Sequence, residues 1–129
     1  MSGSGHLARA MGERPAIVTW SDPADVALGM MQSLRCDRLA VVDSYGVIGI
    51  CERNVLMAHQ QRGARLGSIS VADLMRRGPF WCRADDSPDQ VLLAMERLKT
   101  DTLAVLDPRG RVLGTVQRQR LEEAERARP

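Results

Sequence analysis

Several features that many function classes need are scarce in this sequence. The 129 residues include only 2 histidines, His6 and His59, and 3% aromatic residues. No glycine-rich phosphate loop, nucleophile-elbow motif or metal-ligand cluster is visible, which argues against a catalytic or metal site. So few aromatic side chains provide no stacking platform for nucleic-acid bases. No run of about 18 apolar residues occurs, so we expect no membrane-spanning helix.

Lysine is almost absent as well. Lys99 is the only lysine among 18 basic residues, and the net charge of +2 sets up no strong field toward nucleic acid or an anionic membrane. Arginine suits bidentate contacts with carboxylates and phosphates, which slightly favours an anionic ligand. Codon bias in a GC-rich genome, together with a solvated surface, explains the same excess, and we favour that explanation.

Cysteine is limited to Cys36, Cys51 and Cys82. This odd number without metal-like spacing predicts reduced, mostly buried thiols in a cytoplasmic protein. The Ser/Gly-rich start, residues 1–6, lacks the apolar segment of a signal peptide and is expected to be a flexible tail.

What the sequence does contain is one unit written twice. A shift of 64 positions places Leu39–Asp43 on Leu103–Asp107, and after the following glycine the shift becomes 65. A single one-residue change of shift along the whole chain is hard to obtain by chance. We expect a tail at 1–6, a first domain at 7–61, a linker at 62–70 and a second domain at 71–126. Other matching pairs are Met11 and Met75, Met31 and Met95, Asp37 and Asp101, Gly46 and Gly110, Arg53 and Arg118, and Leu56 and Leu121.

Both copies predict the element order strand-helix-strand-strand-helix. The second strand of each copy, 39–42 or 103–106, is a nearly continuous apolar run, and a tight turn with glycine follows it. Ser87–Gln90 has the pattern of a helix capping box, and Asp22-Pro23 is expected to start the matching helix. A unit this small buries too little surface to be stable alone. We therefore predict an α/β (α+β) fold of two β-α-β-β-α units, packed sheet to sheet about a pseudo-two-fold axis.

The ordered pattern resembles the CBS domain, named after cystathionine β-synthase. The motifs that carry the resemblance are Val71–Met75, Gly78-Pro79, Met95 and Leu103–Gly114 in the second copy, and Met11, Pro15, Met31, Leu39–Asp43 and Gly46–Ile50 in the first. The doubled pattern is similar to a tandem CBS pair, or Bateman module. The resemblance implies clefts between the units that bind adenosine nucleotides in many members. It also implies regulation of an attached or associated enzyme, channel or transporter, and frequent dimerisation.

The resemblance also implies a nucleotide-binding pair, a Thr or Ser near the end of the last strand and an Asp three residues later. Glu52 and Val55 occupy these positions in the first copy, and Gln117 and Arg120 occupy them in the second. The Val55 side chain cannot hydrogen-bond a ribose, and Glu52 repels a phosphate. Alanine replaces the family's usual proline in the apolar strand of each copy, at Ala40 and Ala104.

The second copy is therefore the better candidate for an anion. Gln117, Arg118 and Arg120 offer hydrogen-bond donors to a phosphate or carboxylate, and Arg83 is expected to point into the same cleft. The alternative is that these arginines are surface residues at a helix start. Asp37 and Asp101 either contact a ligand or, as we favour, stabilise a turn through side-chain-to-backbone bonds. The candidate ligand-binding residues are Arg83, Asp101, Ala104, Gln117, Arg118, Arg120, Asp37 and Glu52.

These observations predict a regulatory, ligand-sensing module that is not an enzyme and acts in trans on a partner protein. No cofactor is required, and AMP, ATP or an S-adenosylmethionine-like molecule is the candidate ligand. The alternative is a ligand-free structural dimerisation module, because both ribose-binding positions are lost. We expect a homodimer, with ordinary core packing favoured for Met31. The interface candidates are Met30, Met31, Val55, Leu56 and Met57.

Overall fold

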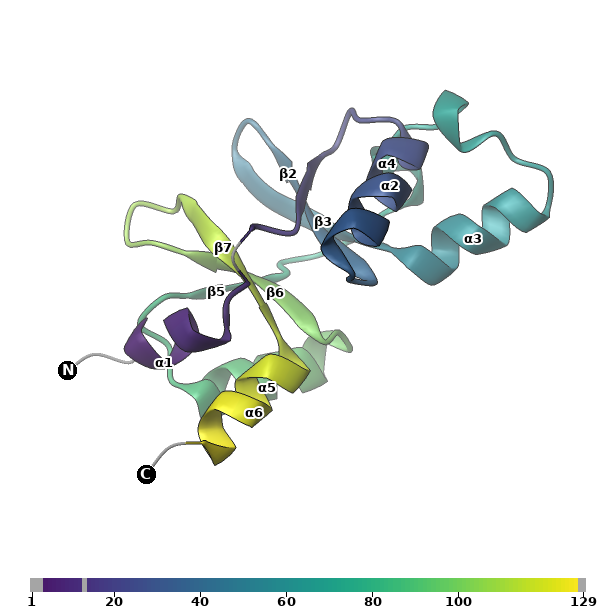
Figure 1. Ribbon diagram of the computed structural model, residues 1–129. Helices are drawn as coiled ribbons and strands as arrows, with labels where there is room; N and C mark the ends of the chain where they lie inside the picture. The colour runs from purple at the N-terminus through teal and green to yellow at the C-terminus, as the bar shows by residue number, and fades with distance from the viewer. Residues whose placement is uncertain (1–3, 13, 128–129) are drawn as a thin grey trace. The chain divides into compact units, whose positions relative to one another are not determined.

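The computed structural model describes residues 4–12 and 14–127 of the chain. By their contacts, the elements form two compact units (Figure 1). The first unit is Ala16–Pro79, and the second unit combines Met1–Pro15 with Phe80–Pro129. The elements are α1 (Ser4–Ala10), β1 (Ile17–Thr19), α2 (Ala24–Leu34), β2 (Arg38–Asp43), β3 (Gly46–Glu52), α3 (Arg53–Gln61), η1 (Leu66–Ser68), α4 (Val71–Leu74), β4 (Arg76–Arg77), β5 (Trp81–Arg83), α5 (Pro88–Leu98), β6 (Thr102–Leu106), β7 (Val112–Gln117) and α6 (Arg118–Arg126).

The first unit is a four-stranded sheet in the order β1-β2-β3-β4. Strand β1 pairs with β2 in parallel, whereas β2 and β3 form an antiparallel hairpin. Helices α2 and α3 contact each other and the two central strands. Their apolar faces place Met31 and Leu56 in the core of the unit, at 1% and 0% exposure.

The second unit repeats this topology with a three-stranded sheet in the order β5-β6-β7. Strand β5 is parallel to β6, and β6 forms an antiparallel hairpin with β7. Helices α5 and α6 contact each other, and their buried residues include Met95 and Leu121. The predicted mixed α/β fold of two β-α-β-β-α units is therefore confirmed.

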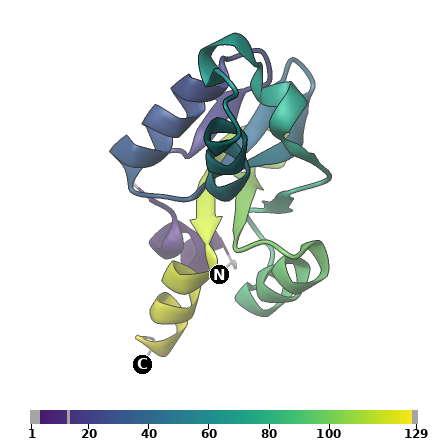
Figure 2. The same cartoon turned by 90° about the vertical axis from the view of Figure 1, so that its right-hand side faces the viewer.

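The segment that leads into each copy packs on the sheet of the other copy. Helix α1 contacts α6 and β7 in the second unit (Figure 2). Met11, which follows α1, forms a β-bridge with Val116 of β7. Strand β4, which leads into the second copy, instead extends the first unit's sheet beside β3. Glycine permits both close approaches, because a Cβ on Gly49 would lie 2.6 Å from the Arg76 carbonyl oxygen and one on Gly114 would lie 3.3 Å from the Met11 sulfur.

The domain boundaries expected from the repeat differ from these spatial units. Residues 4–6, expected in a tail, lie in α1, while residues 1–3 lie outside the described residues. The expected linker 62–70 includes η1, where Leu66 is 3% exposed in the first unit's core. The apolar side chain holds this segment against the first unit, since its burial removes hydrocarbon surface from water.

The two helix starts differ from each other. Ser87 caps α5 in a full capping box: its side chain accepts from the Gln90 N–H, and the Gln90 side chain accepts from the Ser87 N–H. Helix α2 has Pro23 at its N-cap and no side-chain cap. The helix does start at Asp22-Pro23, as expected, but Asp22 does not cap it, because its carboxylate accepts the Thr19 N–H instead.

Two further expectations bear on assembly and on membranes. Met31 is a core residue, as favoured, and Leu56 is fully buried too, so neither offers an exposed contact for a partner. Met30, Val55 and Met57 are half-buried. None of the helices in residues 4–12 and 14–127 is both long and apolar enough to cross a membrane.

Candidate functional site

The two copies build their strand-to-helix junctions in the same way. Glu52 is the N-cap residue of α3, and Gln117 is the N-cap residue of α6. The Arg53 N–H donates to the Asp37 carbonyl oxygen at 2.8 Å, and the Arg118 N–H donates to the Asp101 carbonyl oxygen at 2.7 Å. Each hydrogen bond ties the start of the closing helix to the loop before the apolar strand. We call these two places the first and the second strand end.

Asp37 and Asp101 therefore lie where the repeat predicts, at the two strand ends. Their main-chain oxygens make the matching contacts, whereas the sequence favoured their side chains. The Asp37 carboxylate lies 3.8 Å from the Arg53 guanidinium, and the Asp101 carboxylate accepts from the Thr102 hydroxyl at 3.1 Å. The aspartates thus have a structural role at both junctions.

The first strand end holds a carboxylate between two guanidinium groups. The Arg38 Nε donates to Glu52 Oε2 at 3.2 Å, and the Arg76 Nε donates to Glu52 Oε1 at 3.3 Å. Arg38 lies directly across the hairpin from Glu52, whereas Arg76 comes from β4 on the other side of β3. The Glu52 side chain is 13% exposed, so water screens this network less than it screens surface pairs.

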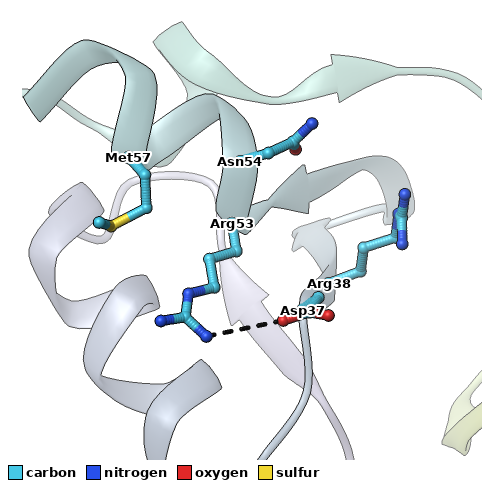
Figure 3. Close-up of a pocket in the computed structure, with 5 residues that line it drawn as sticks. All are labelled: Asp37, Arg38, Arg53, Asn54 and Met57. Atoms are coloured by element: carbon cyan, nitrogen blue, oxygen red, sulfur yellow. Dashed lines mark ion pairs between the residues drawn. The ribbon is translucent and has the colours of Figure 1, made fainter. Parts of the chain in front are cut away.

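A hollow of about 380 Å³ lies next to this network, at the start of α3. In Figure 3 the Arg53 guanidinium reaches toward Asp37, while the Arg38 side chain points away from both. The Asp37–Arg53 pair is well exposed, at 73% and 53% of the two side chains. Water therefore weakens the pair, and it marks a polar surface more than a built binding site. The hollow is lined by Asp37, Arg38, Arg53, Asn54 and Met57.

The second strand end has no internal ion pair at the matching place. Thr102 and Gln117 face each other across the hairpin, where the first unit has Arg38 and Glu52. In the repeat, Gly12 is the residue that aligns with Arg76 of the first unit. A neutral hydroxyl–amide pair thus replaces the charged network.

Two arginines, Arg118 and Arg120, lie in the first turn of α6, directly after Gln117. Arg118 lies 3.4 Å from Glu96 and 3.5 Å from Glu122, so carboxylates neutralise its charge. A guanidinium nitrogen of Arg120 lies 3.9 Å from the place of a Cβ on Gly12. Within residues 4–12 and 14–127, no carboxylate lies within ion-pair distance of Arg120. Arg120 therefore brings a positive charge to the second strand end that no carboxylate of the described residues pairs with.

Arg83 lies away from these residues. It pairs with Leu106 at one end of β6, whereas Gln117 pairs with Thr102 at the other end. Strand β7 runs antiparallel to β6 while β5 runs parallel to it, so the last residues of β5 and β7 lie at opposite ends. The expectation that Arg83 shares a cleft with Gln117 is wrong. The Arg83 guanidinium instead lies 5.5 Å from the centre of the Trp81 ring.

Ala104 lies at the centre of β6 and is fully buried. Its methyl group fills space in the second unit, and no surface of the residue is open to a ligand there. Arg83 lines a separate hollow of about 420 Å³ with Asp85, Asp107 and Leu113 among its walls.

The three cysteines are free and buried, as predicted. Burial raises the pKa of the Cys51 and Cys82 thiols to about 12, with smaller rises from the nearby Glu52 and Asp86 charges. Burial raises the pKa of Cys36 as well. Protonated thiols are weak nucleophiles and weak metal ligands. Among the described residues, no group of three or more His, Cys, Asp or Glu side chains is arranged to hold a metal ion.

Comparisons with known proteins give a family match for part of the chain and a likeness of fold for most of it. Residues 71–125 match the sequence model of the CBS domain family. The chain is similar to a CBS-pair protein of Arabidopsis thaliana, CBSX2, with 21% identity, a TM-score of 0.76, and coverage of 96% of this chain and 93% of the other. No curated protein matches the sequence significantly. Residues 71–125 thus match the CBS domain family, and the chain has the fold of CBS-pair structures, as the sequence predicted.

Two similar structures were solved with bound ligands. The CBS domain pair of protein MJ0100, in complex with 5′-methylthioadenosine and S-adenosyl-L-methionine, has 17% identity and a TM-score of 0.74, over 91% of this chain and 96% of the other. The CBS domain of a bacterial CNNM/CorC family Mg²⁺ transporter, in complex with ATP, has 19% identity and a TM-score of 0.73, over 89% and 82%. At these identities, the likeness concerns the fold.

Sequence reasoning missed the two arginines that hold Glu52. Arg38 faces Glu52 because a register shift between Val41 and Val42 displaces the pairing by one residue, and the hairpin turn alone does not reveal this shift. Arg76 reaches Glu52 because β4 joins the sheet of the other copy. The excess of arginine over lysine was the only sequence signal for such a network.

Proposed function

We propose that this CBS pair is a regulatory, non-catalytic module that senses an anionic ligand at the second strand end and acts in trans on a partner protein. The observation that carries the proposal is the Arg120 guanidinium beside Gly12, with no carboxylate partner among the described residues. The cross-strand pair Thr102–Gln117 is itself neutral, where the first unit has the charged pair Arg38–Glu52. Two structures of similar fold were solved with bound adenosine compounds, which supports a small-molecule role for the module.

The ligand class follows from the residues at this strand end. Arginine and an amide donate hydrogen bonds, which suits phosphate or carboxylate oxygens. Arg120 stands where an acceptor for a ribose diol is expected, so binding rests on the charged group of the ligand and not on its sugar. Among adenosine compounds we expect ATP to bind more tightly than AMP, and adenosine to bind weakest.

A calorimetric titration with ATP, AMP, adenosine and S-adenosylmethionine at millimolar levels tests the proposal. A ligand at one hundred times its Kd stabilises the protein by about 2.7 kcal/mol, which a thermal melt detects. Arg120→Gln is expected to remove the response, whereas Arg109→Gln, the same change of charge in an exposed turn, leaves it intact. A melting temperature that none of the four ligands moves contradicts anion sensing.

The alternative is a ligand-free dimerisation module. The observation that favours it is the loss of both expected ribose acceptors, at Val55 and Arg120. Half-buried Met30 and Met57 stay candidates for the contact surface of a homodimer. Sedimentation with and without ATP separates the two functions, because a dimer that no ligand alters supports the alternative. A 14 kDa species alone at high concentration contradicts it.

A further inference from the structure

We infer that Glu52 is an internal anion that closes the first strand end to phosphate-bearing ligands and so limits the module to one anion site per chain. The inference deepens the proposed function and rests on its assignment of the strand ends as ligand sites. Glu52 is in this sense a specificity-determining residue. The geometry of its two ion pairs carries the argument.

The two guanidinium groups meet on one carboxylate. Arg38 and Arg76 come from β2 and β4, the neighbours of β3 on either side, and each donates through Nε to a different oxygen of Glu52. A phosphate group presents oxygens in the same way to two guanidinium groups. Glu52 therefore occupies the place that an external anion would take between these arginines.

The Glu52 carboxylate is turned to the arginines and not to its own helix. Glu52 is the N-cap residue of α3, yet its side chain makes no cap hydrogen bond. An N-cap carboxylate commonly accepts the N–H of the second or third helical residue. Here the hydrogen bonds to charged donors are the stronger ones, so the side chain satisfies Arg38 and Arg76 instead.

An external phosphate faces two penalties at this strand end. It must displace a tethered carboxylate whose side chain is only 13% exposed, and it must then lie beside that negative charge. Like charges held close together in a partly buried place repel strongly. Removal of the Glu52 charge eliminates both penalties.

Reciprocal substitutions at the matched positions test the inference. Glu52→Gln removes the internal anion from the first strand end, and Gln117→Glu places one at the second. The probe is pyrophosphate, followed by calorimetric stoichiometry and by amide NMR shifts of residues 52–54 and 117–119. Glu123→Gln is the matched control, since it changes the net charge equally at an exposed position on α6.

In Glu52→Gln we expect pyrophosphate to bind at residues 52–54 at least about tenfold more tightly than in the unmodified chain, which corresponds to one hydrogen bond to a charged group. Gln117→Glu is expected to weaken binding at 117–119 by about the same factor, while Glu123→Gln changes neither. Glu52→Thr is the second variant: it removes the carboxylate without adding bulk, so the test survives if one variant fails to fold.

The outcomes separate this inference from the proposed function. Pyrophosphate binding at 52–54 in the Glu52 variants, without binding at 117–119 in the unmodified chain, supports the internal anion and contradicts the proposed anion site. Binding at 117–119 with no gain at 52–54 in folded Glu52 variants overturns the internal anion and leaves the proposed function in place. Equal gains in Glu123→Gln also overturn it, because net charge then explains the effect.

Discussion

The two units share their packing and differ in their charge. Leu56 and Leu121 are both fully buried, and Met31 and Met95 are exposed by 1% or less. At the strand ends, by contrast, the ion pairs of Glu52 in the first unit are replaced by a neutral pair in the second. Core positions tolerate few changes because close packing penalises each change of volume, whereas half-exposed positions are under weaker constraint. Duplication thus preserves the scaffold while the two strand ends diverge.

The largest effect is expected from the shared core. Leu56→Ala and Leu121→Ala each remove a fully buried side chain of the closing helix. Because the cavity term adds to the lost burial, each variant is expected to lose about 2–5 kcal/mol of unfolding free energy. Urea denaturation measures the unfolding free energy of both variants. Half-buried Val55→Ala is the control with a smaller loss, and a clear inequality between the two leucine variants contradicts equivalent packing in the two units.

The second-largest effect is expected from alanine substitutions of Gly49 and Gly114, the matching glycines of the two central hairpins. A Cβ at Gly49 would lie 2.6 Å from the Arg76 carbonyl oxygen, so β4 must move in Gly49→Ala. The corresponding contact at Gly114 is 3.3 Å to the Met11 sulfur, the flexible end of a side chain. We expect a loss of about 2–3 kcal/mol for Gly49→Ala and less than about 1 kcal/mol for Gly114→Ala. Denaturation curves check this order, and the reverse order argues against a tight β3–β4 contact.

A smaller difference is expected at the helix starts. Ser87→Ala removes one half of the capping box of α5 and is expected to cost about 1 kcal/mol of stability. Ser21→Ala is the control in the first copy, where α2 has no side-chain cap. Thermal melts of the two variants measure the difference. Equal melting temperatures for Ser87→Ala and Ser21→Ala would show that the capping box contributes nothing to the stability of the folded chain.

The repeat was enough to predict the fold, because its apolar positions report directly on buried faces. Met31 and Met95 fall on the predicted helix stripes, and Gly46 and Gly110 adopt the positive φ values, 142° and 82°, that the turns require. Such local patterns determine local structure, since burial and backbone sterics act within a few residues.

The site was less predictable, because its residues meet through tertiary pairing. The partners of Glu52 depend on a hairpin register shift and on β4 crossing to the other copy's sheet. Arg83 was misplaced for the same kind of reason, since the direction of β7 relative to β5 decides which ends coincide. Hydrophobic pattern carries no information on register or on which sheet a short segment joins.

The smallest effect on stability is expected from the aspartates of the two hairpin turns, Asp107 and Asp43. Asp107 accepts the N–H groups of Arg109 and Arg111 at 2.9 and 2.8 Å, and its carboxylate lies 3.4 Å from the Arg111 guanidinium. The hydrogen bond from the Arg111 N–H is the main cause that lowers the pKa of Asp107. Asp43, at the matching place, accepts the N–H groups of Tyr45 and Gly46. The ion pair in the second turn adds a pH-dependent contribution to stability.

The sign of this dependence follows from the lowered pKa of Asp107. A carboxyl whose pKa is lower in the folded chain stabilises fully above its unfolded pKa, about 3.9, and the contribution is lost as the pH falls through the folded value. Melting temperatures of the unmodified chain and Asp107→Asn are therefore expected to differ at pH 7, and to converge as the pH falls below the unfolded pKa of the carboxyl and through its lower folded pKa. Asp43→Asn, which removes no ion pair among the described residues, is expected to show a smaller difference at pH 7. A difference for Asp107→Asn that persists unchanged to pH 2 contradicts a role for the carboxylate charge, and would assign the effect to turn geometry alone.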